Sequence, residues 1–146
     1  MVSVEKITHK FSRLDEFLAI LQGMQSTPLD AFMKDKILIG GAKYYLQVSI
    51  ECCLDIANHI IAAERFRAPE DYADSFKVLV EHGILNPEEG MKLRQMAKFR
   101  NRLVHLYGDI DNAYVYDFIL NNLQDILNFE ALIATKFLPR PAEQRR

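Results

Sequence analysis

Residues 37–61 read ILIGGAKYYLQVSIECCLDIANHII, the broadest apolar pattern in a segment that no proline interrupts from Leu29 to Ala63. The absence of proline predicts one long helix over 29–63. Its apolar stripe is too wide for contact with a single neighbour, so we expect it to pack on two sides. A second subunit would help to cover it, as in a four-helix arrangement about a two-fold axis, and we expect a homodimer.

Two local features refine this long helix. Thr27 is expected to cap it, with Pro28 in the first turn and Asp30 three residues after the cap. Gly40 and Gly41 each cost about 1 kcal/mol relative to alanine inside a helix, which indicates either a close contact with another backbone or a bend.

Four further helices are predicted from apolar residues that recur every three or four positions. They are expected at 4–24, from Glu70-Asp71 to His82-Gly83, from Asn86-Pro87 past Phe99, and from Asp111 to residue 137. The helix predicted from Glu70-Asp71 to His82-Gly83 includes Tyr72 in its apolar face. The fold class is therefore all-α, an up-and-down bundle of about five helices. It forms one domain over 1–137, and residues 138–146 are too polar to be ordered and form a flexible tail.

Composition excludes several classes of protein. The formal net charge of −2 rules out a uniformly basic surface, so nucleic acid would have to bind at a local patch. Cys52 and Cys53 are adjacent within a helical pattern and are expected to be reduced core thiols, while the four histidines are too scattered for a zinc site. We expect no metal and no cofactor. The polar start and the lack of a long apolar run predict a cytoplasmic protein without a membrane segment.

One segment, residues 98–108, concentrates the reactive side chains of the chain and reads KFRNRLVHLYG. It follows a helical pattern and ends in glycine. Cleavage of RNA without metal needs a base for the 2′-hydroxyl proton, an acid for the leaving oxygen and a cation for the phosphorane. Arg100 and His105 offer these groups, but they lie about 140° apart on a straight helix. Two copies of His105 across a two-fold axis could supply base and acid, while Arg100 from either chain clamps the phosphate.

A basic stripe along the same helix would attract phosphate to this segment. It consists of Lys92, Arg94, Lys98, Arg100 and Arg102, of which Lys98, Arg102 and Arg94 are the candidate RNA-binding residues.

Plainer explanations compete with this hypothesis. Basic residues and a histidine near a helix C-terminus are favoured by the helix dipole and can simply satisfy the last carbonyls. Glu51 and Asp55 share one helical face and could bind a metal or orient Arg100, or be an exposed or dimer-facing pair. Their best functional role is to support Arg100.

The segment Arg100-Asn101-Arg102-Leu103-Val104-His105-Leu106-Tyr107 resembles the Arg-Asn, three residues, His-x-Tyr signature of the HepT-like toxins, ribonucleases of the HEPN superfamily. Residues 54–61, 68–73 and 108–111 resemble the same family in the same order, over 5–135 in all. The resemblance implies a homodimeric helical ribonuclease that works without metal. It also implies that Arg100 and His105 are catalytic and that Asn101 supports them.

The resemblance also implies a partner. HepT-like toxins pair with a small MntA-like nucleotidyltransferase antitoxin, which is thought to silence them by transferring AMP to the tyrosine that Tyr107 matches. The alternative function is a non-catalytic subunit that binds a nucleotide or docks the nucleotidyltransferase.

Overall fold

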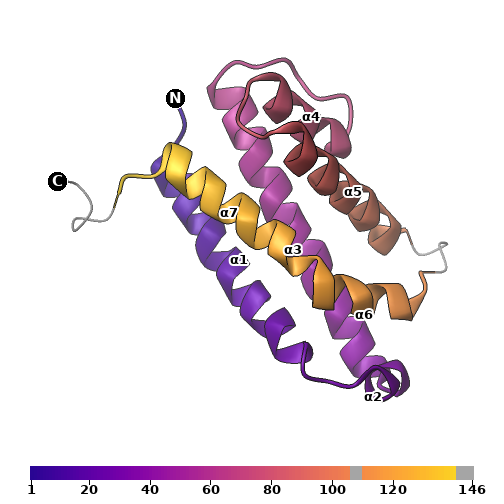
Figure 1. Ribbon diagram of the computed structural model, residues 1–146. Helices are drawn as coiled ribbons and strands as arrows, with labels where there is room; N and C mark the ends of the chain where they lie inside the picture. Colours follow the sequence, from indigo (N-terminus) through magenta and orange to yellow (C-terminus); the bar gives the residue numbers. More distant parts are fainter. Residues whose placement is uncertain (106–109, 141–146) are drawn as a thin grey trace.

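The helices follow the caps and apolar spacings of the sequence. The computed structural model describes residues 1–105 and 110–140, and within these ranges it contains seven α-helices and no strand (Figure 1). They are α1 (Val4–Met24), α2 (Leu29–Lys34), α3 (Lys36–Ala63), α4 (Tyr72–Glu81), α5 (Pro87–Val104), α6 (Asn112–Asn121) and α7 (Leu123–Phe137). The predicted all-α class and the bounds predicted for the first helix are confirmed.

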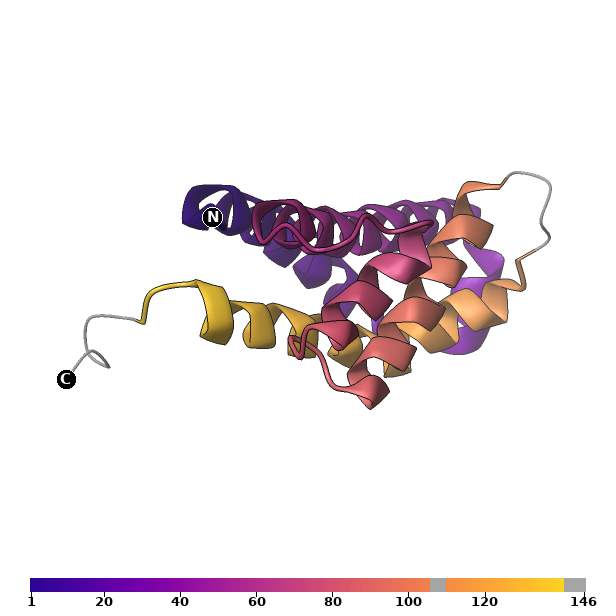
Figure 2. The same cartoon turned by 90° about the horizontal axis from the view of Figure 1, so that it is seen from above.

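Helix α3 runs through the middle of the bundle. Helix α1 packs along one side of it, and the hairpin of α4 and α5 packs along the other (Figure 1). Helices α6 and α7 fold back across one face of this layer, as the view from above shows (Figure 2). The expectation that the central helix packs on two sides is therefore confirmed, but both neighbours come from the same chain. Ile37 (89% exposed) and Tyr44 (55% exposed) remain uncovered on its first half.

The prediction of one helix over 29–63 is wrong, because the chain leaves helical geometry at Asp35. Asp35 has an extended backbone (φ −105°, ψ 96°) and separates α2 from α3. Its Oδ1 accepts the N–H of Leu38 at 2.9 Å, so the side chain caps a new helix instead of continuing the old one. Thr27 is not the cap that we predicted, because Pro28 occupies that position without a side-chain hydrogen bond. The Thr27 carbonyl instead accepts the hydroxyl of Tyr116.

The helix predicted from Asp111 to residue 137 is also divided. Asp111 caps its start as predicted, since Oδ1 accepts the N–H of Ala113 at 2.9 Å. Asn122 leaves helical geometry (φ −114°, ψ −4°), closes α6 and opens α7. The described residues therefore hold seven helices rather than about five, because the helix ends at Asp35 and again at Asn122 although the apolar spacing is continuous across both.

Gly40 and Gly41 mark neither a close contact nor a break within the chain. Helix α3 continues through both. A side chain at Gly40 would meet no neighbouring atom within 4 Å, and one at Gly41 would meet only the end of Met24 at 4.0 Å. Of the two predicted alternatives, the close contact with another backbone is therefore wrong within this chain, and the bend stays a prediction.

Helix α3 is, among the described helices, the one long and apolar enough to cross a membrane. Of its most apolar 18-residue stretch, 56% is buried inside the bundle, as in a core helix. Most of the predicted tail, residues 141–146, lies outside the described residues.

Candidate active site

Helix α5 carries the cluster identified in the sequence, and both of its ends are well defined. Asn86 and Glu89 form a reciprocal capping box, with Pro87 in the first turn. The helix ends at Val104, and the N–H of the following residue, His105, donates to the Asn101 carbonyl at 3.2 Å. The start and the end of this helix are therefore close to those predicted.

Arg100 is held on three sides. Its Nη2 donates to Oε2 of Glu51 at 3.2 Å, and its Nη1 donates to Oδ1 of Asn101 at 3.2 Å. The guanidinium carbon lies 4.7 Å from the centre of the Tyr72 ring. Such a cation–π contact adds to the ion pair because the ring face carries partial negative charge. The side chain is 16% exposed, and its Nε is buried without a hydrogen-bond partner. The guanidinium is thus oriented while part of its donor capacity stays unused.

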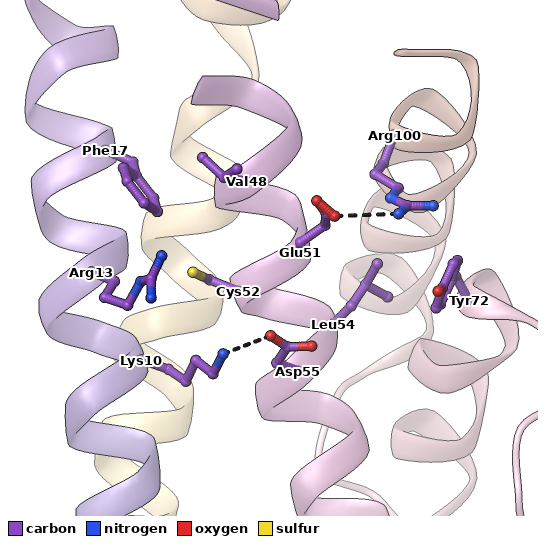
Figure 3. A pocket seen from close by; sticks show the side chains of 10 residues that line it. All are labelled: Lys10, Arg13, Phe17, Val48, Glu51, Cys52, Leu54, Asp55, Tyr72 and Arg100. Carbon is purple, nitrogen blue, oxygen red and sulfur yellow. Dashed lines mark hydrogen bonds and ion pairs between the residues drawn. The ribbon is translucent and has the colours of Figure 1, made fainter. Parts of the chain in front are cut away.

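Glu51 and Asp55 have different partners although they lie one turn apart on α3. Glu51 contacts Arg100 and also accepts the side-chain amide of Gln47 at 3.2 Å. Asp55 forms an ion pair with Lys10 of α1 at 2.8 Å (Figure 3). Of the two possible supports for Arg100, the structure therefore brings only Glu51 to it.

The predicted basic stripe is divided between two faces of α5. Arg94, Lys98 and Arg102 recur every four residues and are exposed. Arg100 follows Lys98 by two residues and so points about 160° away from it, towards α3. Lys92 is engaged with Glu88 at 3.4 Å. Arg100 is therefore separate from the exposed cations instead of continuing their row.

His105 lies at the end of the same helix and is exposed. Its backbone is extended (φ −80°, ψ 109°), so the helix does not carry its side chain round towards Arg100. Tyr107, the predicted modification site, lies outside the described residues. The described chain places Arg100 in a groove and His105 at a helix end.

Tyr72 is a site residue that sequence reasoning missed. We predicted it to be part of an apolar face, but its side chain is 46% exposed and lies against the Arg100 guanidinium. It is the first residue of α4, just after Asp71, whose carboxylate accepts the N–H of Asp74 and caps the helix. No spacing in the sequence links Tyr72 to Arg100.

A groove of about 270 Å³ crosses α3 from α1 to the start of α4 and to α5 (Figure 3). Its charged lining consists of Lys10, Arg13, Glu51, Asp55 and Arg100. Three cations and two carboxylates leave it with one positive charge in excess. The groove therefore favours an anion, and Arg100 lies at one end of it.

Metal and thiol chemistry receive little support from the described residues. No three His, Cys, Asp or Glu side chains gather within them to hold a metal ion. Cys52 and Cys53 are free and buried, as predicted for core thiols. Burial raises the pKa of both thiols, which makes the thiolate form less accessible.

Comparison with known proteins now decides the family. The profile of the family described as ribonuclease HepT-like matches residues 7–133. This chain belongs to the HepT-like ribonucleases. The resemblance noted in the motif is thereby confirmed at the level of the family.

Relatives of this HepT-like chain agree in fold and description. The mRNA nuclease HepT of Shewanella oneidensis is 28% identical over 100 residues, which cover 68% of this chain and 71% of the relative. The tRNA nuclease HepT of Aphanizomenon flos-aquae is 28% identical over 115 residues, 75% of each chain. A solved structure of the tri-AMPylated HEPN toxin of Shewanella oneidensis in complex with an MNT antitoxin is 25% identical with a TM-score of 0.83. It covers 90% of this chain and 98% of that one.

Proposed function

We propose that this HepT-like chain is a metal-independent RNA endonuclease, the toxin of a toxin–antitoxin pair. The observation that carries the proposal is the fixed orientation of the Arg100 guanidinium. Its guanidinium is oriented by Glu51, Asn101 and Tyr72, and Nη1 and Nη2 each carry a second N–H beyond the one that they donate to Asn101 and Glu51. An oriented guanidinium of this kind suits a phosphate, whose oxygens accept two parallel N–H bonds.

The proposed reaction divides three tasks among few groups. A His105 imidazole takes the proton of the ribose 2′-hydroxyl, and the 2′-oxygen attacks phosphorus. The bond from phosphorus to the 5′-oxygen breaks, and the imidazolium of a second His105 protonates that oxygen. Arg100 stabilises the negative charge that develops on the phosphorane. The products end in a 2′,3′-cyclic phosphate and a 5′-hydroxyl.

Two copies of His105 require two chains. Arg100 faces Glu51 on α3, whereas His105 follows the end of α5, and this arrangement supports an active site shared by two subunits. We infer that a two-fold axis lies near the end of α5 and places two copies of His105 on either side of the scissile phosphate. Lys98, Arg102 and Arg94 would then hold flanking RNA outside the groove, while residues 1–137 form the catalytic domain.

A relative of this chain supports a proposal for the partner and its action. The solved relative is described as a tri-AMPylated toxin bound to an MNT antitoxin. We infer that an MntA-like nucleotidyltransferase binds this chain in the cytoplasm and modifies Tyr107. The phenol loses its proton, its oxygen attacks the α-phosphorus of ATP, and pyrophosphate leaves. The AMP group that stays on the tyrosine is bulky and negatively charged, and it blocks RNA. Co-expression with that enzyme should raise the intact mass in AMP-sized steps, and Tyr107→Phe should prevent at least one of them.

The direct test is cleavage of RNA in EDTA. Wild type is expected to produce 2′,3′-cyclic phosphate ends, and His105→Ala is expected to produce none. His9→Ala is the matched control, since His9 is an exposed histidine on α1. Equal cleavage by wild type and His105→Ala would identify the activity as contamination and refute the proposal.

A mixing experiment tests the shared site. Wild type is unfolded, mixed with increasing amounts of His105→Ala and refolded. If each site needs both imidazoles, activity falls as the square of the wild-type fraction, whereas a site within one chain gives a linear decline.

Expression without the antitoxin separates the proposal from the alternative of a non-catalytic binding subunit. Growth arrest that depends on His105 supports the toxin. Harmless expression of soluble wild type supports the binding subunit.

A further inference from the structure

The groove across α3 pairs a guanidinium with an aromatic ring at each end. At one end Arg100 lies over Tyr72, 4.7 Å from the ring centre. At the other end the guanidinium carbon of Arg13 lies 5.8 Å from the centre of the Phe17 ring on α1 (Figure 3). The sequence gives no hint of this repetition, because the two pairs come from helices far apart in the chain.

The charges between the two ends are already matched. Asp55 is paired with Lys10 at 2.8 Å, and Glu51 is paired with Arg100 at 3.2 Å. Arg13 is exposed and forms no ion pair with a carboxylate among the described residues. Arg13 is therefore the cation of the groove whose charge no carboxylate of the described residues neutralises.

We propose that this groove binds the single-stranded RNA segment next to the cleaved phosphate, an assignment that rests on the ribonuclease function proposed above. The exposed ring of Tyr72 stacks on the base beside the scissile phosphate. Arg13 binds the next phosphate along the strand. Alternating cationic and aromatic contacts of this kind hold single strands in many proteins, because every base has a face to stack and every nucleotide a phosphate.

The use of an aromatic ring selects a single strand. The groove, of about 270 Å³, has room for part of one strand. The bases of a duplex are stacked on one another and offer no free face to Tyr72. Loops and unpaired ends are therefore the RNA elements that this chain is expected to engage.

Binding can be measured separately from cleavage in a His105→Ala background. The probe is a fluorescein-labelled 12-nucleotide unstructured RNA in EDTA, followed by fluorescence anisotropy. Arg13→Ala is expected to weaken binding about fivefold to tenfold and to reduce the slope of log affinity against log salt by about 1. Lys136→Ala, which removes an exposed positive charge on α7 away from the groove, is the matched control and should leave the slope unchanged.

Stacking on Tyr72 can be tested by changing the protein and the RNA together. Tyr72→Leu is expected to weaken binding about tenfold, and Tyr72→Phe is expected to bind as well as wild type because it keeps the ring. RNA with one abasic site at the stacked position should also lose about tenfold. If ring and base contact each other, the two changes together cost little more than either alone. Independent losses that multiply would refute the stacking assignment.

The outcomes separate this inference from the function on which it rests. Wild type that cleaves RNA, with binding indifferent to Arg13 and Tyr72, refutes the groove and leaves the ribonuclease standing. Binding that depends on Arg13 and Tyr72, without cleavage by wild type, supports the groove and refutes the ribonuclease. Light scattering gives a third outcome. If wild type is a dimer and Arg13→Ala is not, a second copy of the chain covers the groove, and the inference is also overturned.

Discussion

Glu130 on α7 gives the sharpest prediction for stability. One oxygen of its carboxyl group, Oε2, is buried without a hydrogen-bond partner. Burial raises the pKa of Glu130 to about 8, and the Asp15 carboxylate on α1 adds to the rise, because it accepts the proton of neutral Glu130 and repels its charged form. The group is thus neutral in the folded protein at neutral pH, whereas it is ionised in the unfolded chain. Replacement by glutamine should remove this difference.

The sign follows from proton binding. Between pH 4.5 and about 8 the folded state binds the proton and the unfolded state releases it, so wild type loses stability as the pH rises through this range. The pKa difference between the folded and unfolded states corresponds to a full linkage energy of about 5 kcal/mol, because each pKa unit is worth about 1.36 kcal/mol. Solvent screening of a half-buried group reduces it to about 2 kcal/mol. Glu130→Gln should therefore be about 2 kcal/mol more stable than wild type at pH 8, and nearly equal to it at pH 4.

Urea unfolding at a series of pH values measures this difference. The melting temperature at pH 8 should rise by about 6 °C in Glu130→Gln, a value expected for a domain of this size. Glu16→Gln on α1 makes the same chemical change at an exposed carboxylate and is the control, with no comparable gain. Profiles of wild type and Glu130→Gln that stay parallel from pH 4 to pH 8 would refute the reasoning.

Three further predictions concern packing, capping and the site. A Cβ at Gly90 would lie 2.2 Å from Cγ2 of Val80, so Gly90→Ala should lower the free energy of urea unfolding by about 1–2 kcal/mol. Gly23→Ala is the control: a Cβ there has no neighbour within 4 Å, so the change should be neutral or stabilise by up to about 1 kcal/mol. Asn86→Ala removes the capping box of α5 and should cost about 1 kcal/mol, and a loss below about 0.3 kcal/mol would contradict it. Arg100→Lys keeps the charge but not the planar fork, so RNA cleavage should fall about 100-fold while RNA binding persists, and full activity would exclude bidentate phosphate binding.

Local chemistry accounts for what could be predicted of the fold. The start of α5 was predictable because Asn86, Pro87 and Glu89 satisfy its first backbone donors within a few residues. The breaks at Asp35 and Asn122 were missed because apolar spacing continues across both. At Asp35 the side chain accepts the N–H of Leu38, and at Asn122 the backbone carbonyl accepts the N–H of Asp125, three residues on. Apolar periodicity reports neither contact.

The candidate site was only partly predictable for a similar reason. The spacing of Arg100 and His105 in the sequence already excluded a shared helical face. Two partners of Arg100 come from other helices, Glu51 on α3 and Tyr72 on α4. Glu51 was a candidate support that only packing distinguished from Asp55, whereas no sequence spacing links Tyr72 to Arg100. Tyr72 was misplaced because an aromatic residue fits an apolar face and a surface site equally well in a pattern.

The sequence by itself determined the all-helical class, the caps at Asn86 and Asp111, and the reactive segment that ends α5, because these depend on contacts between residues close together in the chain. The tertiary structure decided which cation faces the groove. Packing of α5 against α3 turned Arg100 inward onto Glu51 and left Arg94, Lys98 and Arg102 in solvent. Packing of α1 on the other side brought Arg13 to the same groove, since burial of the apolar stripe of α3 requires helices on both of its sides.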